Sequence, residues 1–411
     1  MTREEQEQLV TDILDIGESM LLCGAEVSRV ENSITRLFCA YGAERTDVLT
    51  ILSCIELTVS FPGEAPITRQ RRILSSDYDT DLEKLEEWNA LSRRLCAEPE
   101  EPGKLTNEIA VLRKEKEKDK HRDLKQICGY LLASGAFALF FGGTVAEGVT
   151  AAFGGLLIWI AGKGLDKLFV QKLLKTFLLS VLDGGIGLLA GAMGLDPGPV
   201  AAGCVMLLIP GVALTTSIRD TLTGDTISGA LRMVEALVTA CFVAAGLFTA
   251  MLLSGDSFSG SAMTGMAEHS YIQILTGGVG ALGFAMSYRC LRKRNLFCTL
   301  AGALTWAVYL VTAKVWSNTF NPYFFAGASG TLFAEAAARI RKMPATVTLL
   351  PAIIPLVPGR SLYLAMEYTV RSSELVAIGY VQTTAIIAGA IAAGMVCVSA
   401  GLNSYIKIKH K

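Results

Sequence analysis

The sequence predicts a polytopic α-helical membrane protein whose ten spans form two inverted five-helix repeats, preceded by an N-terminal cytoplasmic α+β domain. Three observations lead to this fold class. First, 51% of the 411 residues are hydrophobic, 18% are charged and the mean hydropathy is +0.44, as is typical of a membrane protein. Second, acidic residues gather near the start, because residues 1–125 hold 26 of the 38 Asp and Glu. Third, a Pro-Gly step interrupts two apolar runs in corresponding places, at Pro210-Gly211 and Pro358-Gly359.

These observations divide the chain into four parts. We expect the cytoplasmic α+β domain at residues 1–103, a charged linker helix at 104–125, and two five-span membrane halves at 126–254 and 255–411. The linker is indicated by the Pro- and Glu-rich stretch Glu98–Gly103 and by the densely interleaved charges after it, which favour a solvated helix leading to the membrane.

Helix and strand patterns follow one another in the first part. A helix is predicted from Glu4 to Cys23, with Gly24 as its C-terminal cap. A second helix follows, because apolar residues from Val27 to Phe38 recur at helical spacing. The remaining elements are three strands and one helix, at Asp47–Cys54, Ile55–Phe61, Ile67–Ile73 and Asp77–Leu95. Together they predict a small domain with its own core.

An acidic cluster in this domain has the alternate carboxylates of a cation-binding loop, at Asp77, Asp79 and Asp81. The glycine and the distal glutamate of an EF-hand are missing from the sequence around it. We therefore interpret the cluster as a solvated helix start with Thr80 or Asp81 as the cap, rather than as a metal site.

Other ligand-binding patterns in the chain are weak. Arg69, Arg71 and Arg72 favour an exposed strand beside acidic neighbours over a binding patch. The ten cysteines are scattered without a C-x-x-C pair and there are three histidines, so neither a zinc site nor a disulfide framework is expected. We expect no metal and no cofactor. The soluble part shows no nucleophile and base pair and no phosphate loop, so an enzyme is not expected either.

The membrane part can be oriented by its basic residues. With the N-terminus inside, 16 of the 19 Lys and Arg after residue 125 fall on the cytoplasmic side, which favours cytoplasmic N- and C-termini in a plasma-membrane protein. The exceptions are Lys314, Arg360 and Arg371. No basic region followed by an apolar one opens the chain, so no cleaved signal is expected. The ten predicted spans are 127–143, 147–162, 176–193, 199–218, 229–253, 271–287, 295–313, 322–340, 344–358 and 375–400.

The two halves resemble each other. Residues 153–159 resemble residues 300–306 at an offset of 147, and the two Pro-Gly steps are 148 residues apart. Five spans is an odd number, so the copies must enter the membrane in opposite directions. Inverted repeats with broken helices are a recurrent transporter architecture, with the site at the repeat interface. Glycine patterns such as G-x-G-x-x-G at Gly278–Gly283 lie within apolar spans, where they favour helix packing over a nucleotide site.

Charged residues inside the spans are few. Asp183 on the third span and Glu335 on the eighth are candidates for proton coupling, because a carboxyl group in apolar surroundings can load and release a proton as access alternates. For Glu335, an ion pair with Arg339 one turn later is an equally good interpretation.

The breaks themselves are the candidate substrate site. A half-helix that begins at a break points its N–H groups at an anion, and carbonyls freed before the break can accept from an ammonium, so a zwitterionic amino acid fits both. The candidate residues are Pro210, Gly211, Thr215, Thr216, Arg219 and Asp220 in the first half and Pro355, Pro358, Gly359 and Tyr363 in the second. The alternative for the stretch from Arg219 to Glu235 is a cytoplasmic loop held by ion pairs.

Three stretches of the chain resemble signatures of the threonine/serine exporter family: residues 17–31, residues 210–220 with Gly224-Asp225 and Gly229, and residues 351–359. The resemblance covers nearly the whole chain. It implies export of small hydroxy amino acids, threonine and serine, driven by the proton gradient.

Two alternatives stay open. Relatives are also linked to dicarboxylate export, and a succinate exporter would need Arg219, Arg232 or Arg360 to face the cavity. The other alternative is a membrane-anchored sensor or enzyme that acts through its soluble domain. The expected partners are a small-molecule substrate, protons and membrane lipid, without nucleic acid, and a homo-oligomer is an open question.

Overall fold

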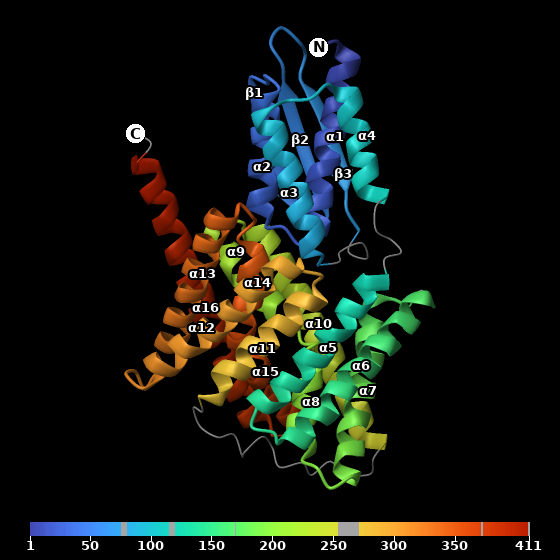
Figure 1. The fold of residues 1–411 in the computed structure, drawn as a ribbon, viewed down its shortest axis with the longest axis vertical. Coiled ribbons are helices and arrows are strands. Elements are labelled where there is room, and N and C mark those ends of the chain that lie inside the picture. Colours follow the sequence, from blue (N-terminus) through green and yellow to red (C-terminus); the bar gives the residue numbers. More distant parts are fainter. Residues whose placement is uncertain (75–79, 115–119, 169, 254–270, 371–372, 410–411) are drawn as a thin grey trace.

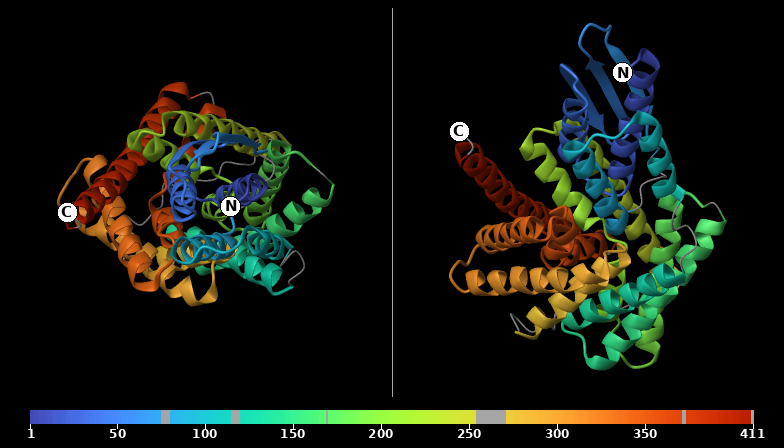
Figure 2. Two further views of the ribbon diagram at one scale, coloured as in Figure 1. Left: turned by 90° about the horizontal axis from the view of Figure 1, so that it is seen from above. Right: turned by 45° about the horizontal axis from the view of Figure 1, so that its top comes forward.

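The computed structural model describes residues 1–74, 80–114, 120–168, 170–253, 271–370 and 373–409. It is mostly helical, and a small α+β unit lies at one end of a larger helical part (Figure 1). Seen from above, this unit lies over the middle of the helices (Figure 2). The acidic residues Asp77 and Asp79 lie outside the described residues. Asp81 caps the following helix, because its carboxylate accepts the Lys84 N–H at 3.0 Å.

The N-terminal unit contains a three-stranded antiparallel sheet in the order β1-β2-β3, in which Leu57 of the central strand pairs with Val48 and Arg69. Alternate residues of this strand, such as Leu57 and Val59, are buried under the helices, as a half-buried strand requires. The predicted order of helices and strands is confirmed, but the first strand ends at Ile51 rather than Cys54 and the third helix begins at Leu82. Their bounds are α1 Arg3–Leu22, α2 Val27–Ala40, β1 Arg45–Ile51, β2 Cys54–Ser60, β3 Ile67–Arg72 and α3 Leu82–Ala97.

Helix α4, Pro102–Lys114, corrects the expectation of a solvated helix after residue 103. Leu105 and Ile109 are buried in the core of the N-terminal unit, so one face of α4 packs against it. The arginines of β3 form ion pairs within the unit: Arg71 lies 2.6 Å from Asp15, and Arg69 lies 3.0 Å from Glu7. These contacts fit the interpretation of a strand beside acidic neighbours.

Apolar helices make up the rest of the chain. Five of them, within the part that the structure describes, are long and apolar enough to cross a membrane, and a sixth candidate is a pair bent by 50° at Pro358. The chain is therefore a polytopic membrane protein. The bounds are α5 Lys120–Phe140, α6 Val145–Lys167, α7 Lys172–Ala192, α8 Pro197–Val205, α9 Gly211–Thr223, α10 Thr226–Leu253, α11 Ile272–Ser287, η2 Arg292–Arg294, α12 Asn295–Ala313, α13 Phe320–Arg341, α14 Thr346–Ile353, η3 Ile354–Leu356, α15 Gly359–Val370 and α16 Glu374–Lys409.

Helices follow the same order in both halves. Three helices, α5 to α7 or α11 to α13, precede a broken pair, and one long helix, α10 or α16, follows it. The first break separates α8 from α9, and the second separates η3 from α15. The span expected at 344–358 stops too early, because the chain becomes helical again at Gly359 and continues to Val370. Helix α9 lies at the end next to the N-terminal unit and α15 lies at the far end (Figure 1).

The first helices of the two halves, α5 and α11, pack closely through glycine. A Cβ atom on Gly283 would lie 2.4 Å from the Ala133 backbone N and 2.9 Å from the Gly129 carbonyl O. A Cβ atom on Gly280 would lie 2.6 Å from Cε2 of the Phe137 ring. The G-x-G-x-x-G pattern therefore serves helix packing, which in membranes depends on small residues at the contact.

We expect Gly283→Ala to destabilise the protein, because backbone atoms cannot move aside as a flexible side chain can. Overpacking of this kind costs about 1–3 kcal/mol or more. The measurement is the thermal unfolding midpoint of the detergent-solubilised protein. Gly185→Ala on α7 is the matched control, because a Cβ there would meet nothing within 4 Å. An equal midpoint for both variants would contradict the close contact.

Candidate functional site

The two Pro-Gly breaks lie against each other. A Cβ atom on Gly211 would lie 1.9 Å from Val357 Cγ1, and a Cβ on Gly359 would lie 2.4 Å from Met206 Sδ. Because each glycine lacks a Cβ atom, a residue beside the break of the other half can pack directly against it. Both proline residues interrupt helical hydrogen bonding, since Pro210 has no N–H to donate to the Met206 carbonyl O. The contact between the two halves thus brings together the two places where the backbone departs from a regular helix.

A cavity of about 820 Å³ extends from these breaks to the N-terminal unit. Its floor includes Met206, Pro210 and Val357, next to the breaks, and its walls come from α7, α9, α10, α11 and α14. Its roof is the α1–α2 loop with Gly24 and Glu26, together with the tip of the β1–β2 hairpin, residues 52–53. This volume lies within the range of small-molecule sites. The cavity connects the repeat interface to the N-terminal unit.

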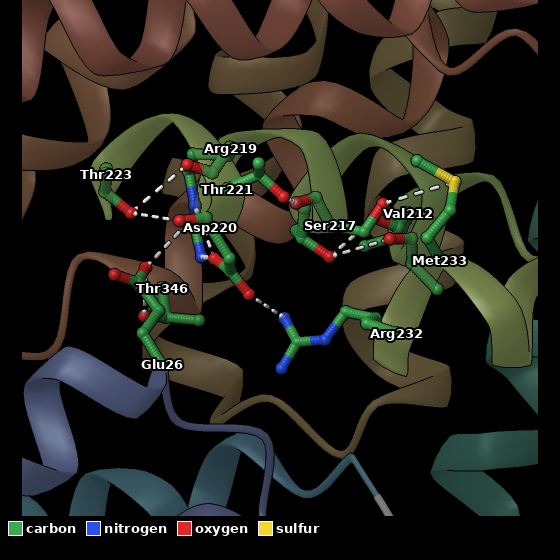
Figure 3. Close-up of polar contacts among 12 residues, drawn as sticks. Glu26, Val212, Ser217, Arg219, Asp220, Thr221, Thr223, Arg232, Met233 and Thr346 are labelled. Carbon is green, nitrogen blue, oxygen red and sulfur yellow. Dashed lines mark hydrogen bonds and ion pairs between the residues drawn. The ribbon is translucent and has the colours of Figure 1, made fainter. Parts of the chain in front are cut away.

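Glu26 carries the contact between this roof and the helices (Figure 3). One oxygen of Glu26, Oε1, accepts from Arg219 Nη1 at 2.9 Å and from Thr346 Oγ1 at 3.3 Å. Arg219 belongs to α9 of the first half and Thr346 to α14 of the second. A single carboxylate oxygen therefore joins the N-terminal unit to both halves.

Asp220 holds Arg219 from the other side. Its Oδ1 accepts from Arg219 Nε at 3.3 Å and from Nη2 at 2.9 Å, and its Oδ2 lies 2.9 Å from Arg232 Nη1 (Figure 3). Two arginines and two carboxylates, including Glu26, thus balance one another beside the cavity. This outcome matches the alternative of a stretch held by ion pairs, but the stretch lines the cavity through Arg219 and Arg232.

The ionisation of Glu26 follows from its surroundings. Burial alone would raise the pKa of Glu26, but attraction by Arg219 and Arg29, with the hydrogen bonds from Arg219 and Thr346, lowers the pKa below its ordinary value of 4.5. The Glu26 carboxylate is therefore charged at neutral pH. Because the folded pKa is the lower one, its stabilisation is fully present above the ordinary glutamate range and is lost as pH falls through the folded value.

We expect a corresponding pH dependence of stability. The unfolding midpoint of the wild type should exceed that of Glu26→Gln by a constant margin between about pH 8 and about pH 5.5, and the margin should shrink in more acidic buffer. Paired thermal melts in detergent at each pH measure this margin. A margin that already falls between pH 7 and pH 6 would indicate a raised pKa for Glu26 and would contradict the pairing.

Further ion pairs, made by Glu86 and Asp81, attach the N-terminal unit through residues that do not line the cavity. Glu86 of α3 lies 2.5 Å from Arg294 Nη2, and Asp81 lies 3.2 Å from Arg289 Nη1. The Leu82 N–H also donates to the Tyr288 carbonyl O at 2.9 Å. Glu86 and Arg294 do not line the cavity. They therefore provide a comparison for Glu26, which both attaches the unit and borders the cavity.

The predicted substrate residues fall into two groups. Pro210, Thr216 and Arg219 line the cavity, whereas Gly211 lies behind them at the crossing. Both threonine hydroxyls donate to α9 itself, Thr215 to the Gly211 carbonyl O at 3.0 Å and Thr216 to that of Val212 at 2.9 Å, so only their oxygen lone pairs stay available. The remaining candidates lie outside the cavity lining: Thr215, Asp220, Pro355, Pro358, Gly359 and Tyr363.

Asp183 and Glu335 have different surroundings. Asp183 is fully buried on α7, and among the described residues neither of its oxygens has a hydrogen-bond partner, nor has Ser180 Oγ one turn earlier. A carboxyl group in such a place is stable when it carries a proton or a bound cation compensates it. Glu335 is partly exposed and lies 3.9 Å from Arg339, as in its alternative interpretation. Neither residue lines the cavity.

Sequence reasoning did not assign a role to Glu26 or Thr346. One signal for Glu26 could have been noticed: the acid stands at the N-cap position of α2, where a side chain would normally accept from its own helix. In the structure Glu26 makes no such bond. Its side chain is used between the domains instead.

Comparisons with known proteins agree with this architecture. Residues 12–254 match the family described as "Putative threonine/serine exporter", and residues 273–400 match the family described as "Threonine/Serine exporter, ThrE". A threonine/serine exporter from Corynebacterium glutamicum is 23% identical over 399 residues, which cover 93% of this chain and 80% of that protein. No solved structure matches the chain. With both halves matched, the chain belongs to the threonine/serine exporter family, a family of membrane exporters.

Proposed function

We propose that this chain exports threonine, serine or a closely similar small amino acid across the plasma membrane by alternating access, with ten spans in two inverted repeats and both termini in the cytoplasm. The observation that carries the proposal is the cavity of about 820 Å³, which reaches both Pro-Gly breaks where they cross. It faces the N-terminal unit. With that unit in the cytoplasm, the structure corresponds to a state that loads substrate from inside.

Backbone groups at the first break suit a zwitterion. Val212 and Ala213 line the cavity in the first turn of α9, where N–H groups have no helical acceptor. Such groups and the helix dipole favour a carboxylate. Met206 also lines the cavity, and its carbonyl O, which Pro210 cannot serve, can accept from an ammonium group. A cavity of this size holds an amino acid together with water.

Charge balance favours an amino acid over a dicarboxylate. Arg219 and Arg232 border the cavity, but each lies within 2.9 Å of an Asp220 oxygen. Arg360 does not line the cavity. A dianion would therefore bring two negative charges to cations that already have carboxylate partners, whereas a zwitterion brings no net charge.

Counterflow into proteoliposomes tests the transport proposal. Proteoliposomes that contain the wild-type protein and are loaded with unlabelled threonine should take up labelled threonine and serine in preference to labelled succinate. Ala213→Phe should abolish this uptake by filling the cavity, while Ala245→Phe, on an exposed face of α10, should leave it unchanged. Uptake of succinate but not threonine, or full activity of Ala213→Phe, would contradict the proposal.

Proton coupling is assigned in this proposal to Asp183. The Asp183 carboxyl group is buried and has no hydrogen-bond partner among the described residues, so its neutral, protonated form is stable there and its charged form costs free energy. Loading and release of a proton can therefore be linked to the conformational change. Asp183 does not line the substrate cavity, so the proposed proton site is separate from it.

We expect Asp183→Asn to abolish accumulation driven by a pH gradient while counterflow persists, because the amide keeps the shape and cannot carry the proton. Transport measured with and without an imposed gradient separates the two activities. Glu335→Gln should retain the pH dependence, since Glu335 is partly exposed and lies next to Arg339. The opposite result for the two variants would move the coupling to Glu335.

A further inference from the structure

We propose that Arg219 and Thr346 form an outer carboxylate subsite of the transport cavity, at its end next to the N-terminal unit and separate from the N–H groups of Val212 and Ala213 at the break. We propose further that Glu26 of the N-terminal unit occupies this outer subsite as an internal substitute for the substrate carboxylate. This inference rests on the proposed function and adds to it a recognition site and a competitor built into the chain.

Donors to Glu26 are arranged as a substrate would need them. One cationic donor, Arg219 Nη1, and one hydroxyl, Thr346 Oγ1, converge on a single carboxylate oxygen at 2.9 and 3.3 Å. They come from different repeats, at the end of the cavity next to the N-terminal unit. A carboxylate bound there contacts both halves at once. A ligand that takes part in alternating access has to make such contacts with both moving parts.

Arg219 remains in place when the partner of its Nη1 changes. Its Nε and Nη2 bind Asp220, and Asp220 also lies 2.9 Å from Arg232. Nη1 is the donor directed at Glu26. Exchange of Glu26 for another carboxylate therefore leaves the guanidinium held by Asp220, with its charge still balanced. The exchange replaces one charge-assisted hydrogen bond with another.

The path of the chain brings Glu26 into the cavity. Gly24 ends α1 with φ +97°, a left-handed conformation that suits glycine, and the next two residues line the cavity. Attachment of the N-terminal unit alone does not require this arrangement, because Glu86 with Arg294 and Asp81 with Arg289 already provide it outside the cavity. Unlike Glu86 and Asp81, Glu26 lines the cavity and contacts α9, the half-helix that begins at the first break.

A tethered carboxylate competes at a high local concentration, in the millimolar range for short connections. Substrate must therefore exceed this level before it displaces Glu26. The arrangement raises the concentration of amino acid at which export is half-maximal. Removal of the Glu26 charge should lower the concentration for half-maximal transport by roughly tenfold, the factor expected if the subsite is free about a tenth of the time.

The experiment compares Glu26→Gln with Glu86→Gln in the full-length protein in proteoliposomes. Glu26→Gln should lower the half-saturating threonine concentration, and Glu86→Gln, which weakens an ion pair outside the cavity, should not. Glu26→Ala is a second variant, and thermal melts verify that each protein is folded. If Glu26→Gln and Glu86→Gln lower the half-saturating threonine concentration equally, the effect comes from weaker attachment of the N-terminal unit. A rise in half-saturation for Glu26→Gln would show that Glu26 binds the substrate ammonium; either result overturns the proposal.

Hydrogen exchange separates this inference from the proposed function. Sodium acetate and L-threonine should each accelerate amide exchange in residues 22–30 of the wild type by displacing Glu26, and L-threoninamide, which has no carboxylate, should not. If the wild type transports no threonine while acetate still accelerates exchange, the proposed function fails and the subsite stands. If neither acetate nor threonine accelerates exchange, the subsite is wrong whatever the protein transports.

Discussion

Gly211→Ala is expected to abolish transport, and the double variant Gly211→Ala with Val357→Ala is expected to restore much of it. The alanine methyl would lie 1.9 Å from Val357 Cγ1 but 3.4 Å from Val357 Cβ. Removal of Cγ1 therefore turns an impossible contact into an ordinary one. The rescue depends on direct contact between the two repeats, because a merely unstable α9 would gain nothing from a smaller residue in the second half.

Threonine counterflow of the wild type, both single variants and the double variant forms a double-mutant cycle for this contact. Overpacking costs about 1–3 kcal/mol or more in a packed interior, and here it falls on the contact between the two breaks. Gly185→Ala, which meets nothing within 4 Å, controls for the loss of a helical glycine. A double variant as inactive as Gly211→Ala would mean that the two breaks do not touch in the working protein.

The second break should respond less strongly to the same change. A Cβ on Gly359 would lie 2.4 Å from Met206 Sδ and 3.3 Å from Met206 Cε, the far end of a flexible side chain. Methionine can adopt another rotamer at small cost, whereas the branched Val357 has one preferred arrangement. The sequence repeat is thus symmetric in its Pro-Gly steps and asymmetric in what each step faces.

Local patterns were sufficient to predict most helices and strands. Helical spacing of apolar residues predicted α2, because a helix that buries one face repeats its apolar residues every 3.6 positions. A C-terminal glycine marked the end of α1, and β-rich segments separated by turns predicted the strands. These patterns failed where burial involves few residues. Helix α4 contacts the unit through Leu105 and Ile109 amid many charges, and Gly359 was taken as an end because a Pro-Gly step usually stops a helix.

Long-range pairing limits what the sequence can predict about the site. Glu26 and Arg219 are 193 positions apart, and Glu26 and Thr346 are 320 apart. A sequence shows that an acid exists but not which cation it meets. The pairing of Glu335 with Arg339, by contrast, is local, and the sequence indicated it because the two residues are four positions apart.

Arg219→Leu is expected to cause the second large loss, in both stability and transport. The change leaves Glu26 and Asp220 without their shared cation, and removal of one partner from a buried ion pair costs about 3–5 kcal/mol. Asp220 keeps Arg232, at 2.9 Å, so Glu26 bears most of the penalty. The double variant Arg219→Leu with Glu26→Gln should therefore regain much of the unfolding midpoint.

Transport should not return with the midpoint, because the double variant has no cationic donor for a substrate carboxylate. The matched control is Arg294→Leu, which removes the partner of Glu86 at 2.5 Å and should lower the midpoint while the half-saturating threonine concentration stays unchanged. Thermal melts and counterflow on the wild type, Arg219→Leu, the double variant and Arg294→Leu separate the role of Arg219 in stability from its role in transport. Recovered transport in the double variant would show that Arg219 only attaches the N-terminal unit. Persistent loss of transport in a protein that has regained its stability would support a contact between Arg219 and the substrate carboxylate, because the recovered midpoint would show that Arg232 alone balances Asp220.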